Sequence, residues 1–327
     1  MKTILSIDGG GILGLIPALV LAEVERRTGK ATCELFDLMA GTSTGGILSL
    51  GLALPGEDGT SPKYSAEAFS EIYLKEGKRI FPKSVWRGVF TGKGWAEEKY
   101  SSQGLMDVLE EKLGDAPLGS ALTPVLVTSY DIQNRAPVFF KSWRDDWRTV
   151  MMREAALATA AAPTYFEPAL IPANGKMLAL VDGGIYINNP ALSAYAELKR
   201  LNAEAEDPVT DEDLFVVSIG TGECAQPIPY EEAKDWGKLG WAMPILNCVF
   251  DGVSDAVNYQ MKHLLGDNFI RFQIPLDKET EAMDDASDAN LERLQSFAHR
   301  LIITHEKEIE TLCERLAPQN TEPVEVV

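Results

Sequence analysis

Residues 2–14 read KTILSIDGGGILG, in which an apolar run meets three consecutive glycines. The run over 2–8 has the length and composition of a short buried strand. After the glycines, apolar residues recur at helical spacing as far as Val24, and Gly29 marks the end of the predicted helix. A glycine turn between a strand and a helix is typical of α/β proteins, whose sites form beyond the carboxyl ends of the strands.

Two more glycine turns follow predicted strands further along the chain. The strand predicted over 35–40 runs into Gly41-Thr42-Ser43-Thr44-Gly45. The strand predicted over 177–182 ends at Asp182-Gly183-Gly184. Because the carboxyl ends of parallel strands share one edge of a sheet, we expect the three turns to converge on one site.

Strands alternate with helices over most of the chain. Further strands are predicted at 124–130, 137–141, 214–219 and 269–274. The alternation indicates an α/β protein with a mostly parallel sheet covered on both faces by helices. Without repeats or low-complexity linkers, we expect one domain over 1–315. It ends in an amphipathic helix at about 289–315, and a loose tail follows over 316–327.

Composition excludes several classes of protein. The chain has 327 residues and a formal net charge of -19, which argues against nucleic-acid binding through phosphate contacts. No apolar run is long enough to span a membrane. The four cysteines are scattered and form no CxxC pair, so neither a disulfide framework nor a structural zinc site is expected. We predict a cytoplasmic protein without metal or cofactor.

The second turn fits the pattern Gly-x-Ser-x-Gly. A sharp strand-to-helix turn exposes the serine, here Ser43, and needs small neighbours such as Gly41 and Gly45. The small apolar helix predicted over 47–54 would place its N-terminal amides and its positive dipole end beside the hydroxyl. Many turns of this composition are only structural, but the position between a strand and a helix favours a nucleophile.

The first turn allows two functional interpretations. Gly9, Gly11 and Gly14 match the GxGxxG dinucleotide fingerprint, but that fingerprint expects an acidic residue at the end of the second strand. Here Asp37 lies within the predicted strand instead. The other interpretation is an oxyanion hole, in which the amides of Gly9, Gly10 and Gly11 face developing negative charge. A merely structural turn is the third.

A serine nucleophile needs a base. The chain has three histidines, His263, His299 and His305, and each falls within a predicted helix rather than a loop after a late strand. Asp182 is better placed, at the junction of a strand and two glycines. A free aspartate has a pKa of about 3.9 and is a weak base, but burial in a closed pocket would raise that pKa. A structural Asp-Gly turn is the alternative.

Together these motifs resemble the patatin-like phospholipase family. The resemblance extends to three further stretches: Ala161–Phe166, Ile187–Pro190 and Ser218–Gly222. It covers roughly residues 3–275 in family order. The resemblance implies a three-layer α/β/α patatin-like fold with a mostly parallel central sheet.

The same resemblance implies a hydrolase of lipid acyl esters that uses a Ser-Asp dyad, with no histidine and no metal. Ser43 would attack the ester carbonyl, and Asp182 would accept its proton. The amides of Gly9, Gly10, Gly11 and Thr44 would form the oxyanion hole, and an acyl-serine intermediate would follow. One departure is Leu13, where many family members carry Arg or Lys. This change puts a phosphate contact at that point in doubt and leaves the backbone amides unaffected.

Two apolar segments are candidates for lipid contact. Residues 236–250 carry Trp236, Trp241, Ile245, Leu246 and Phe250, residue types that suit a bilayer interface. A core or dimer contact explains the segment equally well. Residues 80–90 mix Lys and Arg with Phe81 and Trp86, and are candidates for the acyl channel or a lid. With a net charge of -19, docking on membrane phospholipid would have to be hydrophobic and local.

A free phospholipase endangers the membrane of its own cell, so we expect some control of activity. Bacterial relatives that act in antiviral defence are switched on by cyclic nucleotides, and the resemblance makes such a ligand a candidate activator. The protein could also act as a homo-oligomer, since the sequence does not fix the oligomeric state. The alternatives in function are an acyltransferase with the same mechanism and a catalytically silent nucleotide-binding module.

Overall fold

A mostly parallel sheet runs through the centre of the molecule. The computed structural model describes residues 1–82, 100–203, 208–224, 227–241 and 244–318. The sheet has eight strands in the order β5-β6-β3-β2-β1-β7-β9, and β4 pairs with β3. Its strands are β1 (Lys2–Ile7), β2 (Leu38–Thr42), β3 (Val125–Asp131), β4 (Ala136–Lys141), β5 (Ala169–Ala173), β6 (Lys176–Asp182), β7 (Leu214–Ile219) and β9 (Phe269–Phe272). A second, two-stranded sheet pairs β8 (Glu223–Cys224) with β10 (Pro275–Leu276).

Five neighbouring strands of the sheet, from β3 to the edge strand β9, run parallel to one another. β1 pairs in parallel with β2 and β7, β2 with β3, and β7 with β9. Only β4, β5 and β6 at one side are antiparallel. The carboxyl ends of β1, β2 and β7 therefore meet at one edge, as predicted for the first two glycine turns. The third turn follows β6, which is antiparallel, and comes close to the others because Asp182 pairs with Ser129 on β3. The predicted α/β class is confirmed.

Alternating side chains divide the core into two layers, one on each face of the sheet. On β1, Leu5 and Ile7 belong to one buried cluster and Ile4 to the other. On β7, Phe215 and Val216 divide in the same way. Because successive side chains of a strand point to opposite faces, a strand buried on both sides reads as a continuous apolar run. The continuous apolar runs in these strands therefore require helices on both faces.

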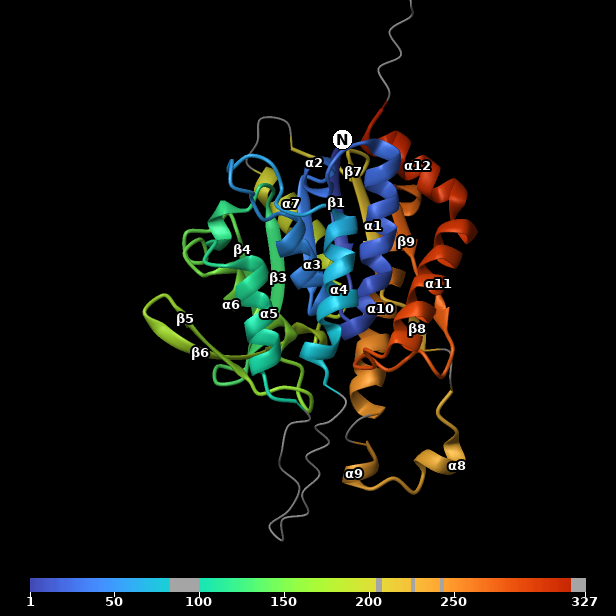
Figure 1. Ribbon diagram of the computed structural model, residues 1–327. Helices are drawn as coiled ribbons and strands as arrows, with labels where there is room; N and C mark the ends of the chain where they lie inside the picture. Colours follow the sequence, from blue (N-terminus) through green and yellow to red (C-terminus); the bar gives the residue numbers. More distant parts are fainter. Residues whose placement is uncertain (83–99, 204–207, 225–226, 242–243, 319–327) are drawn as a thin grey trace, which may run out of the picture.

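Helices cover the two faces unequally. The thicker layer contains α1 (Leu15–Thr28), α3 (Thr44–Leu52), α4 (Ala66–Ile80), α5 (Gln103–Leu113), α6 (Met152–Ala160), α11 (Asp288–Thr304) and α12 (Glu306–Leu316). The opposite face is covered by α7 (Ala191–Asn202) and α10 (Pro244–Leu265). The short helices α8 (Tyr230–Ala233) and α9 (Lys238–Trp241) extend below the sheet in Figure 1, at the end opposite the N-terminus.

Several elements differ from the sequence predictions, and α3 begins at Thr44 rather than at Ile47. The second strand begins at Leu38 because Thr32–Leu35 forms α2, whose first turn is closed by a hydrogen bond from the Ala31 amide to the Glu34 carboxylate at 2.8 Å. The C-terminal helix is two helices, α11 and α12, which separate at His305. The strand β5 was not predicted from the sequence. It forms a hairpin with β6 through Asn174 and Gly175, both with positive φ.

Candidate active site

The first component of the site is a strained turn between β2 and α3. Ser43 lies between them with φ 53° and ψ −123°, a conformation that non-glycine residues rarely adopt. A Cβ on Gly41 would lie 2.1 Å from the Gly45 carbonyl oxygen, and one on Gly45 would lie 2.2 Å from the Ile7 oxygen. The amide of Ser43 donates to Thr159 Oγ1 at 2.8 Å. Only glycines fit on both sides of the serine, as the motif predicts.

Asp182 is the last residue of β6 and is 1% exposed. Its amide donates to the Ala161 carbonyl at 3.0 Å, and its Oδ1 accepts from the Gly184 amide at 2.7 Å. Burial raises the pKa of Asp182 to about 7, while hydrogen bonds from the Ser43 side chain and the Gly184 amide act against that rise. The carboxyl group is therefore poised to exchange a proton near neutral pH.

The two glycines after Asp182 are held in close contact. A Cβ on Gly183 would lie 2.2 Å from Thr128 Oγ1, and one on Gly184 would lie 2.8 Å from the Phe250 ring. Phe250 belongs to α10, on the thinner helical layer. The Asp-Gly-Gly turn is thus pressed between β3 and α10, which fixes the direction of the carboxyl group.

The glycine turn after β1 presents backbone amides at the same place. The Gly9 amide donates to the Asn188 carbonyl at 3.2 Å, and the Ile12 amide donates to the Met283 carbonyl at 2.9 Å. Within the described part of the chain, no acceptor is bonded to the amides of Gly10, Gly11 or Thr44. Gly9 therefore differs from the expectation for an oxyanion donor, because its amide already has a partner. Gly10 and Gly11 are free to bind an anion.

A deep apolar pocket joins these components. Ser43, Asp182, Gly10, Gly11 and Thr44 all line it, so the structure brings the predicted residues together from three strands. The pocket encloses about 980 Å³, part of which is open to solvent. The antiparallel helices α4 and α5 form its far walls with Phe69, Ile72, Tyr73, Gly77 and Ile80 from α4, and Leu105, Val108, Leu109, Lys112 and Leu113 from α5.

Polar groups at the edge of the pocket are satisfied by neighbours. The Tyr73 hydroxyl hydrogen-bonds to Thr44 Oγ1 at 2.6 Å, beside the nucleophile turn. Lys112 Nζ bonds to the Glu76 carboxylate at 2.8 Å. The interior is therefore suited to a long hydrocarbon chain rather than to a polar or charged group.

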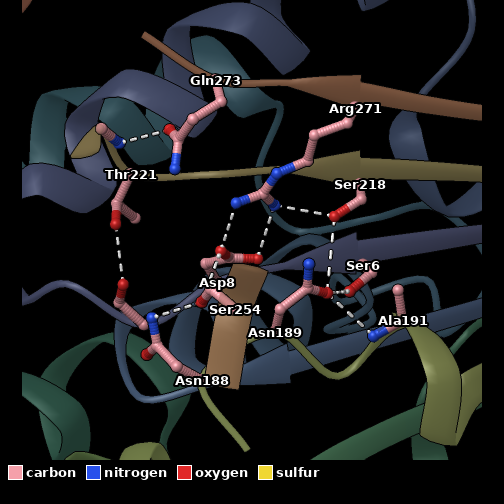
Figure 2. Close-up of polar contacts among 12 residues, drawn as sticks. Ser6, Asp8, Asn188, Asn189, Ala191, Ser218, Thr221, Ser254, Arg271 and Gln273 are labelled. Carbon is pink, nitrogen blue, oxygen red and sulfur yellow. Dashed lines mark hydrogen bonds and ion pairs between the residues drawn. The ribbon is translucent and has the colours of Figure 1, made fainter. Parts of the chain in front are cut away.

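Behind the glycine turn lies a buried ionic network that the sequence analysis missed. Asp8 accepts two hydrogen bonds from the Arg271 guanidinium, at 2.8 and 2.6 Å, and a third from the Ser254 hydroxyl at 3.3 Å (Figure 2). Asn188 Nδ2 donates to the same Ser254 hydroxyl at 3.1 Å. Arg271 comes from β9 and Ser254 from α10, so the network ties three distant segments to the turn.

The structure divides the candidate lipid-contact residues into two groups. Trp241 and Ile245 are exposed at 37% and 45%, and Trp236 packs edge-on against Trp241. Leu246 is half-buried beside them. Phe250 and Phe81 are both 8% exposed and line the pocket, so they lie away from the exposed surface, and their contact with lipid stays a prediction. Trp86 lies outside the described residues.

The residues behind the alternative interpretations lie elsewhere. His263 and His305 bond through Nδ1 to carbonyl oxygens of their own helices, and none of the three histidines lines the pocket. Asp37 pairs with Lys2 at 2.7 Å, near the start of β1 rather than at the glycine turn. Leu13 is 4% exposed and packs in the core.

Among the described residues, no group of three or more His, Cys, Asp or Glu side chains is arranged to hold a metal ion. No described helix combines the length and the hydropathy needed to cross a bilayer.

Comparison with known proteins identifies the family to which the chain belongs. A model of the family described as patatin-like phospholipase matches residues 5–195. Patatin-like protein 4 of Arabidopsis thaliana is 32% identical, over 93% of this chain and 84% of its own length. Patatin group J-1 of Solanum tuberosum is 34% identical, over 92% and 84% respectively. The chain therefore belongs to the patatin-like phospholipase family, and its general activity is lipid acyl hydrolysis.

Proposed function

We propose that the protein releases fatty acids from membrane phospholipids by means of a Ser43–Asp182 dyad. The single observation that carries this proposal is the position of a buried carboxyl group beside a strained serine in an apolar pocket. The free amides of Gly10 and Gly11 line the same pocket. Candidates for the nucleophile, the base and the oxyanion donors thus line one pocket, which supports the proposal.

The proposed reaction has two halves. In the first, Asp182 accepts the proton of the Ser43 hydroxyl as its oxygen attacks the ester carbonyl, and the proton then passes to the departing alcohol. An acyl-serine remains. In the second half, Asp182 accepts a proton from water, whose oxygen attacks the acyl-serine, and Ser43 leaves with that proton. With a pKa of about 7, Asp182 has the two protonation states that these steps require.

The negative charge on the carbonyl oxygen would be held by backbone amides. We assign this role to Gly10, Gly11 and Thr44, and we place Gly9 as a support of the turn because its amide bonds to Asn188. Removal of one such donor from other enzymes costs about 10²–10³ in rate. Leu13 stands where many family members carry Arg or Lys. It is buried in the core, so this position supplies no cation to the site.

The substrate would approach from the end of the sheet where α10 begins. The acyl chain would lie between α4 and α5, where apolar side chains line the pocket. Trp236, Trp241, Ile245 and Leu246 lie before and at the start of α10, whose Phe250 lines the pocket. We propose that this surface, called here the α9–α10 surface, contacts the membrane through hydrophobic side chains.

The dyad is tested by paired substitutions. Ser43→Ala and Asp182→Asn should each abolish hydrolysis of both phosphatidylcholine vesicles and p-nitrophenyl butyrate while the circular dichroism spectrum is unchanged. Ser49→Ala is the matched control, because Ser49 is a fully buried serine on α3 whose hydroxyl bonds to none of the described residues. Hydrolysis that survives in Ser43→Ala would refute the mechanism.

Activation by a cyclic nucleotide, a role in antiviral defence and a homo-oligomeric state stay predictions. A cyclic-nucleotide panel added to the vesicle assay tests the first of them. An added alcohol acceptor, with its acyl ester measured as product, separates acyl transfer from hydrolysis.

A further inference from the structure

The peptide group between Gly9 and Gly10 is held from one side by a buried hydroxyl. Thr221, in the turn after β7, is 4% exposed, and its Oγ1 donates to the Gly9 carbonyl oxygen at 2.7 Å (Figure 2). The described chain contains no cis peptide bond, so the N–H of Gly10 points opposite to the Gly9 carbonyl. A contact to the carbonyl oxygen therefore fixes the direction of the amide on the other side of the same plane.

The direction of this amide matters because Gly10 lines the pocket beside Ser43. Glycine rotates about its backbone bonds with little steric restriction, so a Gly-Gly peptide can reverse unless a partner holds it. The next peptide is held differently, since the Gly10 carbonyl accepts from the Leu13 amide at 3.1 Å within the helical turn. For the Gly9–Gly10 peptide, Thr221 is the side chain that holds the carbonyl oxygen.

We propose that Thr221 is a positioning residue for the oxyanion hole: its hydroxyl locks the Gly9–Gly10 peptide so that the Gly10 amide faces the reacting carbonyl. This inference rests on the proposed function. It adds a residue that does not touch the substrate and acts only through the backbone of the glycine turn.

The surroundings of Thr221 support a fixed side chain. The Gly220 amide donates to the Phe272 carbonyl at 2.9 Å, and the Gly222 amide donates to Gln273 Oε1 at 2.9 Å. Both neighbours of Thr221 are thereby tied to the chain at β9. A Cβ on Gly10 would lie 2.3 Å from Thr221 Oγ1, so the hydroxyl and the glycine backbone are in direct contact.

The test compares Thr221→Val, which removes the hydroxyl at nearly constant shape, with Thr221→Ser, which keeps it. In Thr221→Val the kcat for p-nitrophenyl butyrate should fall about 10²-fold with little change in KM, because the oxyanion exists only in the transition state. Thr221→Ser should restore most of the rate. The affinity for a trifluoromethyl ketone, which forms a tetrahedral adduct with the serine, should fall in parallel with kcat/KM.

Thr123→Val is the matched control. Thr123 is 5% exposed and also donates to a carbonyl oxygen, that of Phe36, at 2.8 Å, but it does not line the pocket. Both valine variants should lose similar free energy of unfolding, and only Thr221→Val should lose kcat. If Thr221→Val fails to fold, Thr221→Ala replaces it.

Equal kcat in the Thr221 and Thr123 valine variants would overturn the inference, as would failure of Thr221→Ser to recover. Its failure is distinguishable from failure of the proposed function. If Ser43→Ala remains active, the dyad is refuted. A crystal structure of Thr221→Val still decides the inference, because an unchanged Gly9–Gly10 peptide would contradict it and a reversed one would support it.

Discussion

Arg271 reaches across the whole width of β7 to bind Asp8. Asp8 follows β1, Arg271 lies on β9, and β7 runs between these two strands. The guanidinium donates to both carboxylate oxygens of Asp8, at 2.8 and 2.6 Å. It also donates to Ser218 Oγ on β7, at 2.8 Å. The side chain of Asp8 is only 2% exposed and that of Arg271 only 10%. A bidentate ion pair therefore anchors the strand that leads into the glycine turn.

Removal of one partner of this pair should destabilise the protein strongly. In Arg271→Met the Asp8 carboxylate stays buried without its cation, and the free energy of unfolding should fall by about 3–5 kcal/mol. The loss should be smaller at pH 5 than at pH 8, because Asp8 can be protonated at the lower pH. Urea denaturation at both values measures the effect.

The double variant Asp8→Asn/Arg271→Met serves as the control for the ion pair. It removes both charges, so it should recover much of the stability lost in the single variant. If Arg271→Met is as stable as the wild-type protein, the ion pair contributes nothing to the fold.

The activity should depend on the ionisation of Asp182. Because burial raises the pKa of this carboxyl to about 7, the base form is the minor one in acid solution. The kcat/KM for a short ester should rise with pH and level off above about pH 7. A profile that is flat across this range would show that a group other than Asp182 accepts the proton.

The same shift makes a prediction for stability. The pKa of Asp182 is 3.8 in its ordinary environment and about 7 in the folded chain, so folding binds a proton between these values. Stability from this group is therefore complete below the lower value and is lost as the pH rises through about 7. The difference in free energy of unfolding between Asp182→Asn and wild type should therefore favour the variant more at pH 8 than at pH 4, by up to about 4 kcal/mol. Thermal unfolding of both proteins across this range measures the difference, and equal pH dependence would contradict it.

The pocket between α4 and α5 should select for acyl length. Val108 is 3% exposed and lines the pocket on α5, so Val108→Phe fills part of the space for a long chain. The ratio of kcat/KM for p-nitrophenyl palmitate to that for the butyrate should fall about tenfold. Val150→Phe controls for overpacking, since Val150 is equally buried and does not line the pocket. An unchanged ratio in Val108→Phe would place the acyl chain elsewhere.

The α9–α10 surface should govern the attack on bilayers. The double variant Trp241→Ala/Ile245→Ser removes two exposed apolar side chains and should weaken binding to phosphatidylcholine vesicles about tenfold or more. The rate on vesicles should fall relative to the rate on a dissolved short ester. Ile303→Ser, at a 70% exposed position on α11, is the control. Binding by the double variant equal to that by the control would exclude this surface.

The local parts of the site could be predicted from the sequence. The strained Ser43 turn needs Gly41 and Gly45 within five consecutive residues, and Asp182 is joined to its own Gly-Gly pair. Such turns depend on short-range backbone sterics, and a single stretch of chain displays them. The turns after β1 and β2 meet because these parallel strands end together, so their convergence followed from the strand pattern. The Asp182 turn follows the antiparallel strand β6 and lies beside them because Asp182 pairs with Ser129 on β3, which the strand pattern did not predict.

The supporting partners could not be predicted in the same way. Arg271 meets Asp8 only because β9 joins the sheet beyond β7, and strand order is a long-range property. Thr221 meets Gly9 for a similar reason. The Asn174-Gly175 pair, by contrast, is a hairpin signal in plain sight between β5 and β6. The break at His305 carries no glycine or proline to mark it.

The positive φ of Ser43 means that stability and catalysis favour different residues at this position. Glycine adopts such a conformation freely, whereas a serine there stores about 1–3 kcal/mol of strain. Selection for thermal stability alone would therefore favour glycine at position 43, and the protein would lose its proposed nucleophile. A library of this protein selected for thermostability needs an activity screen at every round.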